Sequence, residues 1–160
     1  MVMVVWDDEL ATIAQRWADQ CTFGHDTNRN TAEGSVGQNA YIGSSTAEMT
    51  ASNLAASYAS STTAWYEEVN SPGFSKDSVN PFVYSSGAGH YTQVVWGSVR
   101  KVGCGSVHYK DSGSFPYKQL IMCNYYQAGN LQGGTMYTTG TACSSCPTAY
   151  PTCSDSLCTK

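Results

Sequence analysis

The chain has 160 residues and a mass of 17.2 kDa, which predicts one domain with a short appendage. Eight Lys and Arg against twelve Asp and Glu give a net charge of −4, whereas a nucleic acid or an anionic membrane surface requires a basic patch. Apolar runs are only a few residues long, too short for a membrane-spanning helix. We therefore expect neither a nucleic-acid partner nor a membrane span.

The first helix is predicted by apolar residues at three- and four-residue steps. One helical face collects Trp6, Leu10, Ile13, Ala14, Trp17 and Cys21. Asp7 or Asp8 is the expected N-cap, because a short carboxylate accepts hydrogen bonds from the first free N–H groups of a helix. Residues 22–46 are polar and glycine-rich, which predicts a loop with a short strand near 38–42.

A second helix is predicted over about 47–69. Its shared face holds Leu54, Tyr58, Ser61, Trp65 and Val69, and Pro72 with Gly73 ends it. Residues 70–89 form a long loop, and loops of this length in a compact domain are often functional.

The pattern then changes to aromatic and β-branched residues. Residues 90–96 predict either a strand or a short helix, and 102–109 and 119–125 predict two strands joined by a hairpin turn at 111–116. Cys104 and Cys123 lie at comparable depth in the two strands, so an antiparallel pair brings them together. We therefore predict a Cys104–Cys123 disulfide.

The seven cysteines bear on the cellular location of the protein. Four of them fall in the last eighteen residues, where almost no aliphatic residue is available for packing, so cross-links must hold this tail in place. Clustered cysteines with low charge favour an oxidising, extracellular location over a cytosolic protein with free thiols. The alternative for the tail is a zinc site that uses Cys143, Cys146, Cys153 and Cys158.

Three histidines occur, and two of them are candidate metal ligands. His25 and His90 each follow a glycine in a predicted loop, where the two chains could converge on an ion; the alternative is that each is simply hydrogen-bonded. His108 lies among polar residues of the hairpin and is expected at the surface.

Two acidic residues, Glu67 and Glu68, end the second predicted helix. A carboxylate at a helix C-terminus opposes the helix dipole, so at least one is expected to have a partner such as a histidine. No Gly-x-Ser-x-Gly motif occurs, so the sequence does not predict a serine nucleophile. Cys21 lies four residues before His25, and nothing else in the sequence marks it as a nucleophile.

Two segments carry a resemblance to a known family: GHYTQVVW at 89–96 and LIMCNYYQAGNLQG at 120–133. They resemble the two signature motifs of the CAP superfamily, which contains cysteine-rich secretory proteins, insect venom antigens and plant pathogenesis-related proteins. WYEE at 65–68, CTFGHDT, VGQNAYIG and the cysteine-rich tail are similar to further family segments. The resemblance extends from about Trp6 to Lys160.

The resemblance implies an α+β fold for residues 1–140, a three-layer α/β/α sandwich around a three-stranded antiparallel sheet. A disulfide-rich hinge follows at 141–160. In family members a central cleft carries two histidines and two glutamates, which correspond here to His25, Glu68, His90 and the residue at position 38. The two histidines bind zinc or another divalent metal in some members, so Zn²⁺ or another divalent metal ion is the expected, weakly bound cofactor.

The family hinge also implies the pairings Cys143–Cys153 and Cys146–Cys158, which leave Cys21 unpaired. Position 38 departs from the family pattern because it is Gln38, and an amide neither takes up a proton nor adds negative charge. Relatives also have a preceding helix with a His-Asn-x-x-Arg pattern, and this chain begins after that helix and ends at the hinge.

The function implied by the resemblance is that of a secreted, venom-allergen-like effector that binds a sterol, a fatty acid or another small lipid. Phe74, Phe82 and Tyr84 are the expected apolar lining, although the same residues could instead pack the loop onto the domain. One alternative is a secreted effector that binds a host or target protein and no small ligand. A metal-assisted protease with His25, Glu68 or His90 in acid–base roles is the least favoured.

Overall fold

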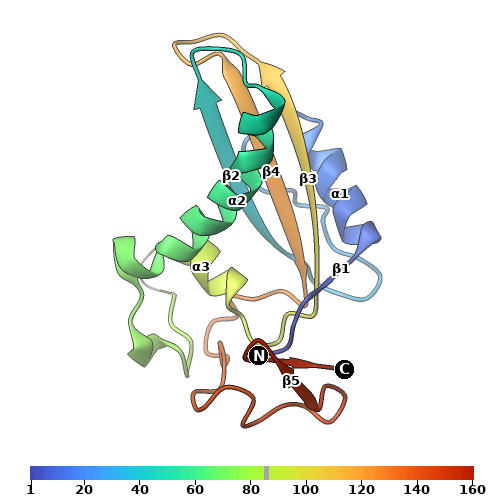
Figure 1. Ribbon diagram of the computed structural model, residues 1–160, viewed down its shortest axis with the longest axis vertical. Coiled ribbons are helices and arrows are strands. Elements are labelled where there is room, and N and C mark those ends of the chain that lie inside the picture. The colour runs from blue at the N-terminus through green and yellow to red at the C-terminus, as the bar shows by residue number, and fades with distance from the viewer. Residues whose placement is uncertain (85–86) are drawn as a thin grey trace.

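The computed structural model describes residues 1–84 and 87–160, and it has a sheet between two helical layers (Figure 1). The sheet has the order β1-β3-β4-β2 and consists of β1 (Val5–Trp6), β2 (Gly37–Ser45), β3 (Lys101–Lys110) and β4 (Tyr117–Tyr126). One face packs against α1 (Asp8–Ala18), and the other packs against α2 (Ala51–Glu67) and α3 (Gly89–Val94). This is the α/β/α sandwich that the family resemblance implies.

The long antiparallel hairpin of β3 and β4 forms the centre of the sheet. Its two cysteines, Cys104 and Cys123, are direct cross-strand partners and form the predicted disulfide. β2 pairs antiparallel with β4 and is longer than the predicted strand at 38–42. The short β1 adds a parallel partner to β3, so the sheet has one strand more than the three expected.

The N-terminal helix packs closely against the hairpin. Asp7 is its N-cap, with the carboxylate accepting from Leu10 N–H, and the buried residues are Leu10, Ala14 and Ala18. The helix predicted from the apolar spacing was too long at both ends. Trp6 belongs to β1 and is 57% exposed, while Cys21 lies beyond the helix and is also exposed.

The second helical layer begins after Thr50, which caps α2, and this helix ends at Glu67 rather than at the predicted residue 69. The predicted loop contains two short helical segments, η1 (Val69–Gly73) and η2 (Lys76–Ser78), and residues 90–94 lie in α3, the helical alternative. An aromatic core fills the space beneath this layer and includes Trp65, Phe82, Tyr91, Trp96 and Tyr125.

The cysteine-rich tail is a small hairpin of β5 (Thr152–Ser154) and β6 (Leu157–Thr159). The N-terminal segment holds it to the body: Met3 N–H donates to the Cys158 carbonyl at 3.0 Å, and Cys158 N–H donates to the Met1 carbonyl at 2.8 Å. Chain segments from opposite ends of the sequence therefore lie side by side (Figure 1). Within residues 1–84 and 87–160, no helix is both long and apolar enough to cross a membrane.

Candidate functional site

A cavity of about 400 Å³ lies beside the first residues of β2, one of the two edge strands of the sheet. Its lining consists of His25, Gln38, Asn39, Tyr84, Gly87, Gly89, His90 and Asn130. His25 comes from the loop after α1, whereas His90 belongs to α3 in the opposite layer. The structure thus brings the two candidate metal ligands to one polar cleft beside the start of β2.

The His90 ring is held by Glu68, which follows the last residue of α2. The Glu68 Oε1 atom lies 2.5 Å from His90 Nδ1, and Oε2 accepts the backbone N–H groups of His90 and Tyr91, each at 3.0 Å. Trp65 stacks on the imidazole, with 6.1 Å between the ring centroids. Glu68 therefore has the histidine partner that its position at a helix C-terminus predicts, and His90 is left with Nε2 for a ligand.

The exposed His25 ring is held in a similar way by Gln38, which is only 7% exposed. Gln38 Oε1 lies 3.1 Å from His25 Nδ1 and accepts the backbone N–H of Asp26 at 2.9 Å. The Gln38 Nε2 atom donates to Asn124 Oδ1 at 2.9 Å. Both polar ends of the Gln38 amide are therefore used, and the His25 Nε2 atom remains for a ligand.

The loop that presents His25 is fixed by Asp26, which is 3% exposed. One carboxylate oxygen accepts from Asn28 N–H at 2.7 Å, and the other lies 3.8 Å from a guanidinium nitrogen of Arg16. Arg29 donates to the Asp26 carbonyl at 2.5 Å. These contacts keep His25 at the cleft although its own side chain is exposed.

Asn130 holds the other side of the cleft. Its Oδ1 accepts from the Thr92 hydroxyl at 2.6 Å, its Nδ2 donates to the Gly89 carbonyl at 2.9 Å, and its backbone φ is 58°. The sequence prediction did not include Asn124 or Asn130. A polar Asn124 inside an apolar strand, and an Asn130 next to a glycine, are the signals that could have identified them.

Of the three aromatic residues expected to contact a lipid, Tyr84 lines the cleft. Phe82 is 0% exposed and packs edge-to-face on Trp96 with 5.0 Å between centroids. Phe74 stacks on Phe82 at 6.0 Å and contacts Tyr91. Phe74 and Phe82 thus attach the loop to the core, the alternative role that the sequence left open.

The tail cysteines form the two disulfides implied by the resemblance, Cys143–Cys153 and Cys146–Cys158, and Cys21 is the free cysteine. The sulfur atoms of Cys143, Cys146 and Cys158 lie within 4.8 Å of one another, which is metal-binding range. As disulfides they provide no thiolate, the form that binds a metal. In this oxidised state the cysteines cross-link the tail and do not act as a zinc site.

The sequence profile of the CAP family, described as the cysteine-rich secretory protein family, matches residues 1–125. The chain belongs to the CAP family. Venom allergen 5 of Microctonus hyperodae is 51% identical over 136 residues, which cover 84% of this chain and 55% of that protein. The CRISP/Allergen/PR-1 protein of Trittame loki is 41% identical over 152 residues, covering 92% and 36%. The chain thus spans about half or less of the length of these curated relatives.

Solved CAP structures have the same fold. BmVAL-1 superposes with a TM-score of 0.80 at 29% identity, covering 100% of this chain and 77% of that one. NaASP2 with Zn²⁺ superposes with a TM-score of 0.73 at 29% identity, covering 99% and 77%. The three disulfides, in a family described as secretory, fit an extracellular protein.

Proposed function

We propose that this venom-allergen-like CAP protein is secreted and binds a divalent metal ion in the cleft through Nε2 of His25 and Nε2 of His90. One observation carries the proposal: each ring is held by a hydrogen-bonding partner at Nδ1, and both line the same cavity. Histidine ligands in metal sites typically have such a partner on the second nitrogen, which orients the ring toward the ion.

The remaining groups of the cleft favour Zn²⁺ over Ca²⁺ or Mg²⁺. Both carboxylate oxygens of Glu68 already accept hydrogen bonds from His90 and Tyr91, and Gln38 contributes a neutral amide. Imidazole suits zinc, whereas calcium and magnesium require oxygen ligands. The Zn²⁺ of the similar NaASP2 structure supports the same choice of metal. With two protein ligands, we expect weak binding completed by water.

The test is titration of the metal-free, oxidised protein with Zn²⁺ in a calorimeter at neutral pH. His90→Ala should abolish the binding, whereas His108→Ala should leave it unchanged, because His108 is exposed on β3 and stacks on Tyr117 instead. Binding should also weaken toward acid, since protons compete with the metal ion for the imidazole nitrogens. Identical isotherms for the parent and His90→Ala would refute the two-histidine site.

A second candidate function is binding of a sterol or fatty acid in a larger cavity, of about 650 Å³, between the tail and the body. Its volume lies in the range usual for small-molecule sites, roughly 300–1,000 Å³. Apolar side chains that line it include Val2, Met136 and Leu157. This cavity suits a lipid better than the polar cleft does, and neither Phe74 nor Phe82, the positions expected from the sequence, lines it.

Hydrolysis receives less support from the geometry. Glu68 is a weak candidate for the general base because its carboxylate already accepts three hydrogen bonds from His90 and Tyr91, and the free nitrogens of His25 and His90 are the ones assigned to the metal. Gln38 provides no proton acceptor of comparable strength. If neither zinc nor a lipid binds, the remaining hypothesis is that the protein is an effector that contacts a host or target protein.

A further inference from the structure

We infer that Asn124 is a positioning residue of the cleft: by orienting the Gln38 amide, it holds neutral His25 as the Nδ1–H tautomer and leaves Nε2 as the ligand nitrogen. The tautomer follows from hydrogen bonds of the chain itself. Its value for metal binding rests on the function proposed above.

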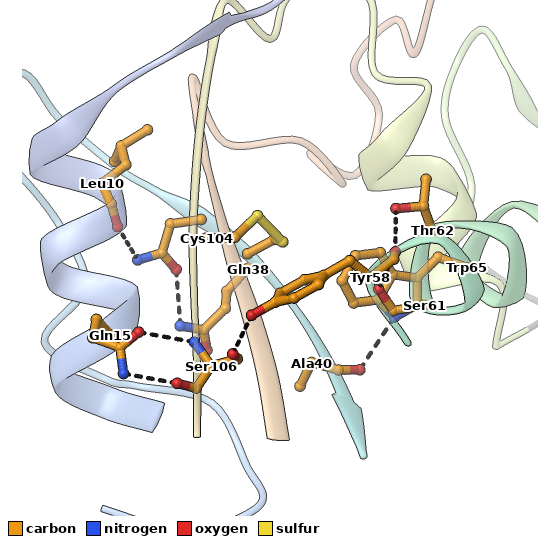
Figure 2. The surroundings of a disulfide bond; sticks show 12 residues. Leu10, Gln15, Gln38, Ala40, Tyr58, Ser61, Thr62, Trp65, Cys104 and Ser106 are labelled. Atoms are coloured by element: carbon orange, nitrogen blue, oxygen red, sulfur yellow. Dashed lines mark hydrogen bonds between the residues drawn. A yellow bond between two sulfur atoms is a disulfide. The ribbon is translucent and has the colours of Figure 1, made fainter. Parts of the chain in front are cut away.

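Three hydrogen bonds form a continuous chain from the His25 loop to α1. The backbone N–H of Asp26 donates to Gln38 Oε1 at 2.9 Å, Gln38 Nε2 donates to Asn124 Oδ1 at 2.9 Å, and Asn124 Nδ2 donates to the Leu10 carbonyl at 3.3 Å. Figure 2 shows the last two bonds, with Leu10 of α1 and Gln38 of β2 on either side of the intervening amide.

Both ends of this chain are backbone groups with fixed polarity. A peptide N–H is always a donor, and a peptide carbonyl is always an acceptor. Reversing either amide would place two donors or two acceptors against each other. The orientations of Gln38 and Asn124 therefore follow from the fold, although the two ends of an amide have almost the same shape.

The oriented amide determines the proton on His25. Gln38 Oε1, which lies 3.1 Å from Nδ1, is an acceptor only, so Nδ1 must donate and Nε2 keeps its lone pair. A carboxylate at position 38 would accept with either oxygen and would need no orientation. An amide must present its oxygen rather than its nitrogen to His25; the Asp26 N–H holds the oxygen end of Gln38, and Asn124 holds the NH₂ end.

Because Asn124 is buried, water cannot take its place in holding the Gln38 amide. Asn124 is 0% exposed and is the direct cross-strand partner of Gln38 in the pairing of β2 with β4. Water is therefore excluded from replacing Asn124 as the acceptor. Without it, the Gln38 NH₂ group would be buried and unsatisfied, so the side chain would gain by rotating toward the cleft, which breaks its hydrogen bonds to Asp26 and His25.

The experiment compares Asn124→Asp with Asn124→Leu. Leucine loses both hydrogen bonds of the Asn124 side chain, whereas aspartate keeps an acceptor for Gln38, so the comparison tests the orienting bond. The readout is the long-range ¹H–¹⁵N spectrum of the zinc-free protein at mildly alkaline pH, in which the two neutral tautomers of histidine have distinct nitrogen shifts. His25→Ala identifies the His25 signals.

We expect the Nδ1–H tautomer in the parent and in Asn124→Asp, and a shift toward Nε2–H in Asn124→Leu. Zinc affinity should fall about tenfold in the leucine variant and less in the aspartate variant, in line with losses at outer-shell partners of metal ligands. If Asn124→Leu does not fold, Gln38→Leu removes the acceptor for His25 directly and should release the tautomer in the same way.

An Nε2–H tautomer in the parent, or equal spectra for a folded leucine variant and the aspartate variant, would overturn the inference. An Nδ1–H tautomer retained in Gln38→Leu would do the same. If the parent has the Nδ1–H tautomer and yet binds no zinc, the inference stands and the proposed metal function fails. The two ideas are therefore tested separately.

Discussion

Asp7 combines two stabilising contacts at the start of α1. Its carboxylate accepts the Leu10 N–H at 3.0 Å and lies 3.2 Å from Lys101 Nζ on β3. The backbone hydrogen bond from Leu10, together with the nearby Lys101 ammonium, lowers the pKa of Asp7 below its ordinary value of 3.8. One side chain thus starts the helix and links it to the sheet.

The lowered pKa of Asp7 determines how its contribution to the free energy of unfolding changes with pH. The folded state favours the ionised carboxylate, so its contribution is present above the unfolded pKa near 4 and is lost as the pH falls through the lower, folded pKa. We expect Asp7→Ala to lower the free energy of unfolding by about 1 kcal/mol at pH 7, and by less at pH values below the folded pKa. Urea denaturation at both pH values measures this.

Glu9→Ala, in the same helical turn, is the control for that measurement, because Glu9 is exposed and its side chain has no described hydrogen bond in residues 1–84 and 87–160. A loss for Asp7→Ala that is the same at both pH values would show that the ionised carboxylate contributes nothing beyond the neutral cap.

Sequence reasoning at this scale found residues with strong chemical signatures and missed those whose role depends on a partner. His25, His90 and Glu68 attracted attention through their own chemistry. Asn124 acquires its role only because β2 and β4 pair in a register that places it opposite Gln38. Such a long-range pairing is not visible in local periodicity.

At the scale of elements, α1 and β3 approach each other more closely than side chains would allow. An added Cβ at Gly105 would lie 2.3 Å from the Gln15 backbone, and one at Gly103 would lie 2.2 Å from Ala11 N. Gln15 bonds with its side chain to both backbone groups of Ser106, while the Tyr58 hydroxyl of α2 reaches the Ser106 hydroxyl (Figure 2). Glycine at these positions thus sets the spacing between layer and sheet.

Gly105→Ala should therefore force α1 away from the sheet and lower the free energy of unfolding by about 1–3 kcal/mol, the usual cost of overpacking. Gly43→Ala is the matched control, since Gly43 also lies in a strand and its added Cβ would make only ordinary contacts, 3.6 Å to the Tyr41 ring and 4.0 Å to the Gln119 carbonyl oxygen. Chemical denaturation of both variants measures the difference. Equal stabilities would contradict the close-packing argument.

The elements themselves were largely predictable from the sequence. The hairpin turn, the antiparallel strands and the Cys104–Cys123 bridge follow from alternation and spacing, and the structure confirms them. Trp6 was placed wrongly in a helix because its spacing to Leu10 fits the helical period, although Val5 and Trp6 pair with β3 instead. A two-residue strand is too short to leave a periodic signal.

At the scale of the whole molecule, the two cavities lie in separate regions and should respond to different changes. The cleft is lined by β2, α3 and loop residues such as His25 and Asn130, whereas the larger cavity is closed by the tail and its disulfides. We expect Cys143→Ser/Cys153→Ser to weaken binding of cholesterol or a long-chain fatty acid, because Cys143 lines that cavity. Competition assays with labelled lipid measure the loss.

Zinc titration of the same double variant is the control and should match the parent, because the cleft contains neither cysteine. Lipid binding that persists unchanged without this disulfide would argue against the tail cavity as the lipid site. The resemblance predicted the tail disulfides, but it gave no indication that Met1–Met3 would pair with β6.

That pairing has a practical consequence for engineering. The two ends of the described chain lie together, far from the exposed turn at 111–115 that joins β3 to β4 (Figure 1). A short peptide could join these ends, and the chain could be reopened at the turn, since adjacent ends favour circular permutation. A fluorophore or a fused domain attached at the new ends would then project from the opposite pole, clear of the tail.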